Sequence, residues 1–591
     1  MKPVIDILDD RISGAMAAAV NQKHCLAMVC PSTDPQFGDY QANGVMALGK
    51  RFKRNPRELA EEVVKNLDVS DICEQPEVAG PGFINLRLKP QFIADRLLEI
   101  NKNITNLGID KTDVPKTVVV DFSGPNIAKQ MHVGHLRSTI IGDCICRLLE
   151  FQGHKVIRQN HIGDWGTQFG KILYVVNELG RRQDYTNITF GLNTLEKLYQ
   201  KANQLEKTDP NIALQMRDWT FQLQRGNTIA KSFWKISCDV TLKECYEIYK
   251  ILSVNLNSTH TRGESEYRDE LAGIVEDLLN RKIARKSDNA VCVFPEGFKN
   301  KEGEPLPFII QKSDGAYLYA TTDLAAIRYR INKLKADKII YVTDARQKLH
   351  FEMLFAVARM AGWVSDDIEL MHVTFGSVLG EDGTPLKTRS GENVKLKELL
   401  DEAIERAKNI VEGKNPELSA ERKVQIAKAV GLGAVKYADF SNNRTSDYIF
   451  SFEKMLAMDG NTAPYMQYAY ARIKSIERKA QSRDVDIETE LANLKTLKRL
   501  SLDEPAEIDL AKQLSRYGEA VEAAAADYRP NYLTGYLYEL AQKFSVFYTN
   551  CPVLKAGREK RGTRLLLCDL TAKTIKHGLS ELLGIDVVEQ M

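Results

Sequence analysis

Residues 123–139, SGPNIAKQMHVGHLRST, bring two histidines, a lysine and a proline together with glycine in one short stretch. The stretch follows TVVVDF (117–122), which predicts a buried strand, and runs into a helical pattern that begins LRSTIIGD. In open α/β sheets, ligands bind beyond the carboxyl ends of the strands, where a helix N-terminus offers unpaired N–H groups and a positive dipole end. The stretch therefore predicts a binding site for phosphate.

The types and spacing of these residues narrow the prediction to a nucleotide. His132 and His135 are three residues apart and share a face as the helix begins. Gly134 removes a side chain between them, so that a nucleotide can approach the backbone, and Lys129 adds a mobile positive charge. The plain structural alternative is a pair of surface histidines beside a loop glycine. The site is not a P-loop, because no G-K-[ST] is present, and no G-x-G-x-x-G follows the strand.

The elements that must position this stretch form an alternating pattern. Between residue 117 and about residue 400, strand-like segments alternate with helical ones, which predicts a parallel α/β sheet with right-handed crossovers. A long, mainly helical insertion is expected at about 175–260. The strand-like segments are TVVVDF, HKVIRQNHIG (154–163), KIIYVTD (338–344) and MHVTFGSV (371–378).

The length of 591 residues requires several domains. Residues 1–110 mix helical periodicity with short strand-like pieces, which predicts an α+β domain. Residues 111–410 form the expected α/β domain, and residues 411–591 are almost purely helical, which predicts an all-α bundle. The sequence GLGAVK (431–436) lies within that helical pattern, so we do not interpret it as a dinucleotide fingerprint.

Composition excludes some classes of protein. The chain is 43% hydrophobic and 27% charged with a net charge of +2, so basic residues that meet a polyanion must be gathered in local patches. Ten cysteines without C-x-x-C spacing indicate free thiols in a reducing compartment rather than a zinc or redox site. We expect no signal peptide, no membrane span and a cytoplasmic location.

Two motifs carry a resemblance to a known family. SGPNIAKQMHVGH resembles the H-I-G-H signature of class I aminoacyl-tRNA synthetases, and its S-x-P-N-x-A-K beginning resembles the arginyl members of that class. LGEDGTPLKTRSGENVKL (379–396) follows MHVTFGSV, in the place of the second signature, K-M-S-K-S. Of that signature it keeps the first lysine, Lys387, and the serine, Ser390.

The resemblance implies a Rossmann-like catalytic domain that joins arginine to tRNA(Arg) at the expense of ATP. His132, Gly134, His135, Lys387 and Ser390 are then the expected ATP-binding residues. His132 and His135, with Lys129 and Lys387, are the expected catalytic groups. Mg²⁺ is expected to arrive with ATP, since no protein metal site is visible in the sequence.

The resemblance also implies an arginine-binding set, Asp121, Asn126, Tyr319, Asp323 and Gln347. Tyr319 and Asp323 are four residues apart and would share a face of a helix. The structural alternative for Asp323 is the N-cap of the following helix. A carboxylate suits this substrate, because it accepts two parallel hydrogen bonds from a guanidinium.

The sequence indicates contacts with tRNA less clearly than it indicates the nucleotide site. Tyr465, Tyr468 and Arg472 interleave aromatic and basic side chains that could stack on unpaired bases, although Tyr468 could equally belong to the core of the bundle. By resemblance, the C-terminal domain reads the anticodon. The N-terminal domain, with Tyr40 and Gln41, meets the outer corner of tRNA.

The expected activity is therefore that of an arginine–tRNA ligase, acting as a monomer that needs tRNA before it activates arginine. One alternative is an adenylating enzyme of the same fold for another cationic or small acid. The other is a catalytically inactive, synthetase-like regulatory protein that binds tRNA.

Overall fold

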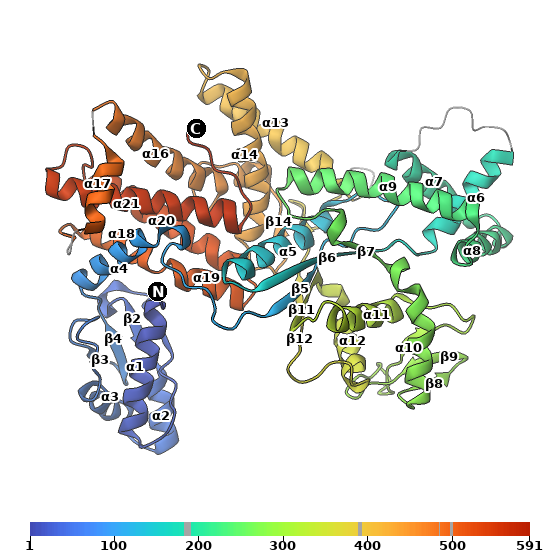
Figure 1. Cartoon of the computed structure of the whole chain (residues 1–591), viewed down its shortest axis with the longest axis horizontal. Helices are drawn as coiled ribbons and strands as arrows, with labels where there is room; N and C mark the ends of the chain where they lie inside the picture. The colour runs from blue at the N-terminus through green and yellow to red at the C-terminus, as the bar shows by residue number, and fades with distance from the viewer. Residues whose placement is uncertain (182–190, 388–392, 484, 497–499) are drawn as a thin grey trace. The chain divides into compact units, whose positions relative to one another are not determined.

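The computed structural model describes residues 1–181, 191–387, 393–483, 485–496 and 500–591 (Figure 1). The chain divides into two compact units, which are described separately. One unit contains residues 1–111 with 457–581 and 586–591, and the other contains residues 112–456 with 582–585.

The second unit is built on a five-stranded sheet whose neighbouring strands are all parallel, and the four strands predicted from the sequence are all in it. Its order is β12 (Glu369–Phe375), β11 (Lys338–Asp344), β5 (Thr117–Asp121), β6 (Lys155–Ile162), β7 (Thr261–Gly263). The chain moves outward from β5 to β6 and β7, and later returns to β11 on the other side of β5. The strand order thus reverses between β5 and β11, which is where a doubly wound sheet opens a crevice for ligands.

Helix α5 (Val133–Phe151) begins at that crevice and is held close to the sheet. Gly142 makes the approach possible, because a Cβ there would lie 2.3–2.5 Å from atoms of the Phe122 side chain. On the same helix Arg137 forms an ion pair with Asp439 at 2.9 Å, and both side chains are 1% exposed. Arg137 also donates a hydrogen bond to the carbonyl of Ser446 at 3.0 Å. These contacts fix the direction in which the N-terminus of α5 points.

The helical insertion predicted from the sequence lies between β6 and β7. Its helices share one apolar core, to which Phe169, Leu195, Met216 and Phe233 contribute. Figure 1 shows them grouped together on one side of the parallel sheet. They are α6 (Gln168–Arg181), α7 (Leu192–Glu206), α8 (Pro210–Gln224), α9 (Thr228–Ile251).

A second insertion was not predicted. It follows helix α10 (Arg268–Asn280) and is an antiparallel sheet of β8 (Ala284–Ser287), β9 (Ala290–Val293) and β10 (Phe308–Gln311). Each strand has four residues, too few to show a clear alternation in the sequence. The sheet packs against α10, α11 (Tyr319–Asn332) and α12 (Lys348–Met360) in one apolar cluster.

The compact unit extends beyond residue 410, where the sequence placed a boundary. Helices α13 (Leu396–Lys414) and α14 (Ala420–Phe440) lie within it, as do β13 (Val378–Leu379), β14 (Tyr448–Ile449) and α15 (Phe452–Met455). Gly431 lies at the contact of α13 with α14, where a Cβ would approach the carbonyl oxygen of Ala403 to 2.6 Å. The glycine-rich GLGAVK is therefore a helix-packing feature and not a dinucleotide loop.

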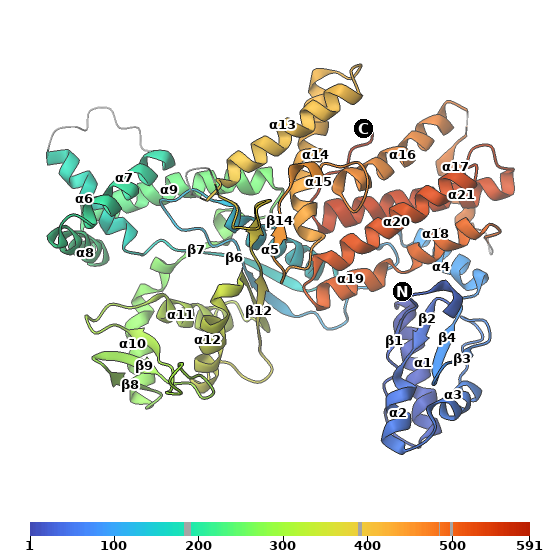
Figure 2. The ribbon, with the colours of Figure 1, turned by 180° about the vertical axis from the view of Figure 1, so that it is seen from behind.

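The other unit joins the two ends of the chain. Its N-terminal part is an antiparallel sheet of order β1 (Val29–Pro31), β2 (Tyr40–Ala42), β4 (Phe83–Leu86), β3 (Glu77–Ala79). Figure 2 shows this sheet together with α1 (Val4–Ala19), α2 (Gly44–Phe52), α3 (Pro56–Lys65). Helix α4 (Pro90–Lys102) packs against the C-terminal helical bundle. The bundle contains α16 (Ala463–Gln481), α17 (Ile487–Thr496), α18 (Pro505–Ser515), α19 (Tyr517–Ala526), α20 (Pro530–Asn550), α21 (Arg558–Lys576).

All ten cysteines are free thiols, and Cys144 and Cys146 on α5 are buried. Among the described residues, no helix is both long enough and apolar enough to cross a membrane.

The buried pair of Arg137 with Asp439 generates a stability prediction. Burial raises the pKa of Asp439 against the opposing charge of Arg137, so loss of the arginine leaves a carboxyl group unpaired in the core. We expect Arg137→Met to cost about 3–5 kcal/mol, and Arg137→Met combined with Asp439→Leu to recover much of that loss. Thermal unfolding midpoints of the single and double variants measure this. A double variant no more stable than the single one would contradict the role given to the pair.

Candidate functional site

The two signature histidines close the N-terminus of α5. His132 is the N-cap residue, and its Nδ1 accepts a hydrogen bond from the backbone N–H of Gly134 at 3.1 Å. In return, Nδ1 of His135 accepts from the backbone N–H of His132 at 3.1 Å, and the two rings lie 4.0 Å apart between centroids. The predicted pairing on one face of the helix start is confirmed, in the form of a reciprocal cap built from imidazoles.

This cap determines the protonation state and the tautomer of the two imidazoles. Burial lowers the pKa of His135 to about 3, and burial with the nearby charge of Lys129 lowers the pKa of His132. Both rings are therefore neutral at pH 7. Because each Nδ1 accepts a backbone N–H, the hydrogen-bond pattern assigns the proton to each Nε2. Two neutral Nε2–H donors at a helix N-terminus suit the oxygens of a phosphate.

Gly134 is required by the cap itself. A Cβ at this position would come within 2.8 Å of Cε1 and 2.9 Å of Nδ1 of the His132 ring. Any larger residue would have to displace the imidazole or its hydrogen bond. Gly134 is therefore needed to accommodate the His132 ring. This is in addition to the access to the backbone that the sequence suggested for a nucleotide.

The two signature segments are joined by their backbones. The N–H of Val133 donates to the carbonyl of Val394 at 3.0 Å, and the N–H of Leu396 donates to the carbonyl of Met131 at 2.9 Å. Lys387 is exposed and pairs with Asn393 across the loop. Residues 394–396, which follow the loop that contains Lys387, therefore pair through their backbones with residues 131–133 of the first signature. Ser390, together with Thr388, Arg389 and Gly391, lies outside the described residues.

Lys129 reaches toward the helical insertion. Its Nζ lies 4.9 Å from the centroid of the Tyr199 ring on α7, a cation–π contact. The lysine is exposed, and its charge acts on His132, as does that of Arg346. Arg346 belongs to the short 3₁₀ turn Ala345–Gln347, which directly follows β11, so the exposed Gln347 also lies at this edge of the sheet.

A second cluster surrounds Asp323. Its Oδ2 is 2.7 Å from Nε2 of His350, and its Oδ1 is 3.9 Å from Nε2 of His161. Tyr319 is 62% exposed, and its ring lies 5.0 Å from that of His350. Helix α11 begins at Tyr319, with Leu318 as its N-cap, so Asp323 lies inside the helix. This excludes the N-cap alternative and places Tyr319 and Asp323 on one face.

The other two residues predicted to bind arginine lie at the end of β5. Asp121 is paired with the fully buried Arg330 (Nη2 to Oδ2, 2.7 Å), so a protein guanidinium already balances its charge. Asn126 is exposed and pairs through its backbone with Gly163, where a Cβ would come within 2.5 Å of Asn126 Oδ1. Of the two predicted carboxylates, Asp323 is the better placed to meet a cation.

Sequence reasoning missed several groups of this cluster. Glu264, in the 3₁₀ turn Glu264–Tyr267 after β7, has its pKa raised to about 7 by burial and then by the negative charges of Asp323 and Asp164. Asp164 accepts hydrogen bonds from the N–H of Ser265 at 2.9 Å and from its hydroxyl at 2.7 Å. Asp164 and Asp323 thus add negative charge around the carboxyl group of Glu264, and this charge favours the cationic group of a ligand.

The residues predicted to contact tRNA belong to the other unit. Tyr40 is fully buried, and its hydroxyl donates to Glu519 at 2.6 Å, so its side chain has no surface to offer and we withdraw it from the set. Gln41 is half-buried and donates to Asn85 at 2.8 Å. Tyr468 is 36% exposed, which excludes the core alternative for this residue.

The helix α16 residues form a surface group. Nη2 of Arg472 donates to the hydroxyl of Tyr468 at 2.8 Å, and its guanidinium lies 4.7 Å from the Tyr468 ring centroid. Tyr465 is half-buried, with its ring 5.8 Å from that of Tyr538. The arrangement leaves the Tyr468 ring and the guanidinium available to bases. In the described part of the chain, no group of three or more His, Cys, Asp or Glu residues could hold a metal ion.

Three family models match the chain. "tRNA synthetases class I (R), catalytic domain" matches residues 99–452, "DALR anticodon binding domain" matches 466–591, and "Arginyl tRNA synthetase N terminal domain" matches 6–88.

Similar proteins cover nearly the whole chain. The arginine–tRNA ligase of Hahella chejuensis is 47% identical over 99% of both chains, and that of Nostoc punctiforme is 49% identical over 95% of this chain and 94% of its own. The crystal structure of arginyl-tRNA synthetase from Plasmodium falciparum matches with a TM-score of 0.84 and 30% identity over both whole chains. The Thermus thermophilus arginyl-tRNA synthetase, 24% identical over both whole chains with a TM-score of 0.81, has the same fold.

The depressed pKa of His135 generates a prediction about protonation. Its folded-state pKa of about 3 lies below the usual value of about 6.5, so the ring stays neutral as the pH falls through that usual value. We expect the ¹³C-labelled imidazole of His135, assigned with His135→Asn, to show no titration between pH 8 and pH 5. An inflection of His135 near pH 6.5 would rule out the buried neutral cap.

Proposed function

Because the chain belongs to the arginyl-tRNA synthetases, we propose a role in arginylation for each group of the site described above. The activity is that of an arginine–tRNA ligase. The arginine carboxylate attacks the α-phosphate of ATP, giving arginyl-adenylate and pyrophosphate. A hydroxyl of the terminal adenosine of tRNA then takes the arginyl group, and AMP leaves. The relatives do not support the inactive alternative.

The activation step depends on the phosphate-facing groups. His132 and His135 donate their Nε2–H groups to ATP phosphate oxygens at the N-terminus of α5, with Gly134 keeping the cap in place. Lys129 and the loop of Lys387 and Ser390 stabilise charge on the transferring phosphates. No covalent enzyme intermediate is needed, so positioning and charge stabilisation supply the acceleration. The observation that carries this proposal is the backbone pairing of residues 394–396 with 131–133.

Arginine recognition depends on the carboxyl cluster. Asp323, held by His350, receives the guanidinium, with Tyr319, Asn126 and Gln347 around it. Asp121 acts on the same side through its pairing with Arg330, and Glu264 is a further acidic group. A ligand without the cation would leave the excess negative charge of this cluster without a cationic partner, and an uncompensated buried charge costs about 3–5 kcal/mol, or two to three decades in affinity.

The tRNA contacts are assigned to the other unit. Tyr465, Tyr468 and Arg472 contact unpaired bases of tRNA(Arg), in or beside the part of the chain that matches an anticodon-binding model. Gln41 contacts tRNA from the N-terminal sheet. The finer division at residues 110 and 410, into a tRNA-contacting, a catalytic and an anticodon-binding domain, remains a proposal. So do Mg²⁺ bound with ATP, the monomeric state and the cytoplasmic location.

Pyrophosphate exchange into ATP tests the function. We expect exchange with arginine only when tRNA(Arg) is present, no exchange with lysine, ornithine or citrulline, and loss of exchange in His135→Ala with tRNA affinity nearly unchanged. Loss of one phosphate donor corresponds to about 3–4 kcal/mol in the barrier. Exchange with arginine alone would contradict the dependence on tRNA, and full activity of His135→Ala would contradict the phosphate site.

The acidic cluster generates a prediction about pH. Glu264 has a raised pKa of about 7, and a bound guanidinium favours its charged form. Below pH 7 the group must release a proton when arginine binds, so arginine affinity falls as the pH falls, approaching tenfold per pH unit. The KM for arginine, measured from pH 6 to pH 8.5 at saturating ATP and tRNA, should therefore rise as the pH falls below 7. Glu264→Gln should flatten it, and an unchanged profile in that variant would refute the assignment.

A further inference from the structure

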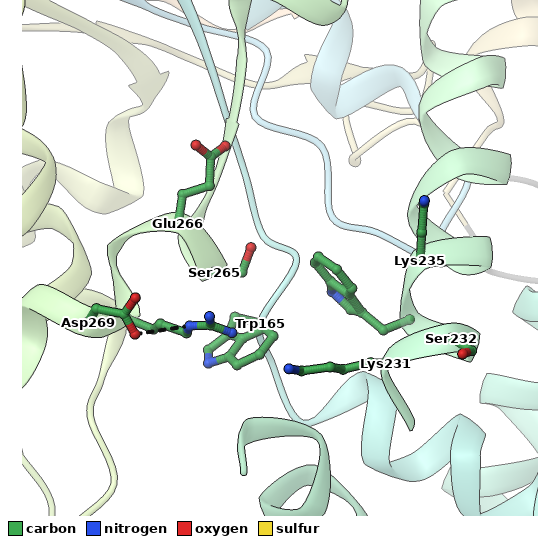
Figure 3. Close-up of a pocket in the computed structure, with 9 residues that line it drawn as sticks. Trp165, Lys231, Ser232, Lys235, Ser265, Glu266 and Asp269 are labelled. Carbon is green, nitrogen blue, oxygen red and sulfur yellow. Dashed lines mark hydrogen bonds and ion pairs between the residues drawn. The ribbon is translucent and has the colours of Figure 1, made fainter. Parts of the chain in front are cut away.

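A cavity of about 530 Å³ lies where the helical insertion faces the segment after β7. Figure 3 shows its wall: Lys231, Ser232 and Lys235 come from α9, while Ser265, Glu266 and Asp269 come from the opposite side. The volume is that of a small-ligand site. None of the roles assigned above uses this cavity.

Two indole rings form its apolar part. Trp165 and Trp234 are half-buried and meet edge to face, with ring centroids 5.9 Å apart. The indole N–H of Trp234 donates to the carbonyl of Asp164 at 2.7 Å, and the guanidinium of Arg268 lies 5.9 Å from the Trp165 ring centroid. The rings are thus fixed from both sides, which makes them a preformed stacking surface.

The cavity also has an uncompensated positive charge. Glu266 is paired with Arg262 at 2.9 Å and Asp269 with Arg268 at 3.1 Å, so the two acidic residues of the wall are already neutralised. Lys231 and Lys235 are exposed on successive turns of α9, and within the described chain neither forms an ion pair. In Figure 3 Lys231 extends from α9 toward Trp165. Aromatic faces beside free ammonium groups fit a nucleotide, whose base stacks while its phosphate meets the lysines.

The cavity shares a wall with the arginine cluster. Asp164 accepts from Trp234 through its carbonyl and from Ser265 through its carboxylate, and Glu264 directly precedes Ser265. A ribonucleotide in the cavity would therefore lie next to the carboxyl groups assigned to arginine. The terminal adenosine of tRNA must reach that arginine, so the nucleotides just before it must pass close to this wall.

Building on the proposed function, we propose that this cavity binds an unpaired nucleotide of the tRNA 3′ strand immediately upstream of the terminal adenosine. Its base stacks on Trp165, and its phosphate lies between Lys231 and Lys235. The cavity serves to hold the single strand in line, so that the terminal ribose meets the arginyl group. Base stacking of this kind tolerates any base, and the site is therefore expected to position the strand without reading its sequence.

The test compares two tRNAs and two lysine pairs. Lys231→Ala with Lys235→Ala should weaken binding of intact tRNA(Arg) about tenfold and reduce the slope of log Kd against log salt by about 1.4, since two phosphate contacts on a single strand are lost. Binding of tRNA shortened by its last three nucleotides should not change. Lys197→Ala with Lys201→Ala is the matched control: these lysines have the same spacing, are exposed on α7 and do not line the cavity, so neither tRNA should be affected.

Trp165 supplies an independent readout. Trp165→Phe should keep the affinity for intact tRNA and Trp165→Leu should lose it, because only the first retains a ring for stacking. With 2-aminopurine in place of the penultimate base, the parent and Trp165→Phe should quench its fluorescence on binding, and Trp165→Leu should not.

Three outcomes would overturn the proposal. An equal loss of affinity for intact and shortened tRNA would show that the two lysines contact another part of tRNA. No loss of affinity for either tRNA would show that they contact no tRNA. A raised KM for ATP with unchanged tRNA affinity would identify a free nucleotide as the ligand. Arginylation by the parent is measured first: if it fails, the proposed function fails, whereas an active parent with an unaffected variant refutes only this inference.

Discussion

The rest of the site depends on how the N-terminus of α5 is capped. A helix start leaves N–H groups without partners, and here two imidazoles satisfy some of them through Nδ1. The same hydrogen bonds leave each Nε2 as a donor and hold the rings 4.0 Å apart. One interaction therefore sets the tautomer of both histidines and the place at which we propose that phosphate binds. Gly134 is a consequence of that constraint, because a Cβ there would come within 2.8 Å of the His132 ring.

The charges of the catalytic unit follow a division between the two sides of the crevice. Lys129 and Arg346 act on the histidine side, where phosphates are to be neutralised. Asp164, Glu264 and Asp323 lie on the other side, where we propose that the amino-acid cation binds. Asp121 belongs to neither group, because the buried guanidinium of Arg330 already balances its charge. A buried carboxylate with an internal partner holds the architecture, whereas one with a raised pKa and no such partner is poised for a ligand.

The sequence predicted what is encoded locally. The strands 117–121 and 338–344, the helix after the signature and the common helix face of Tyr319 and Asp323 follow from residue periodicity over a few positions. Contacts between distant residues could not be read in this way. Glu264 and His350 acquire their roles only when β7 and α12 reach the same sheet edge, and Tyr40 is buried by Glu519, far along the chain. The end of the unit near residue 456 depends likewise on packing of α13 and α14, which look like any other helices in sequence.

The helical insertion contacts both signature segments through its helix α7. On α7, Tyr199 lies against Lys129, Asn193 accepts from Gln130, and Glu196 pairs with Lys395 at 3.5 Å, next to the end of the second signature loop.

Helix α9 lines the tryptophan cavity and packs on α7 in one apolar core. A nucleic-acid strand that prefers one arrangement of α9 would therefore also favour one arrangement of the residues that we propose to bind ATP. By reciprocity, ATP would favour the strand by the same factor. The dependence of arginine activation on tRNA that we predict would thus have a physical route within a single packed element.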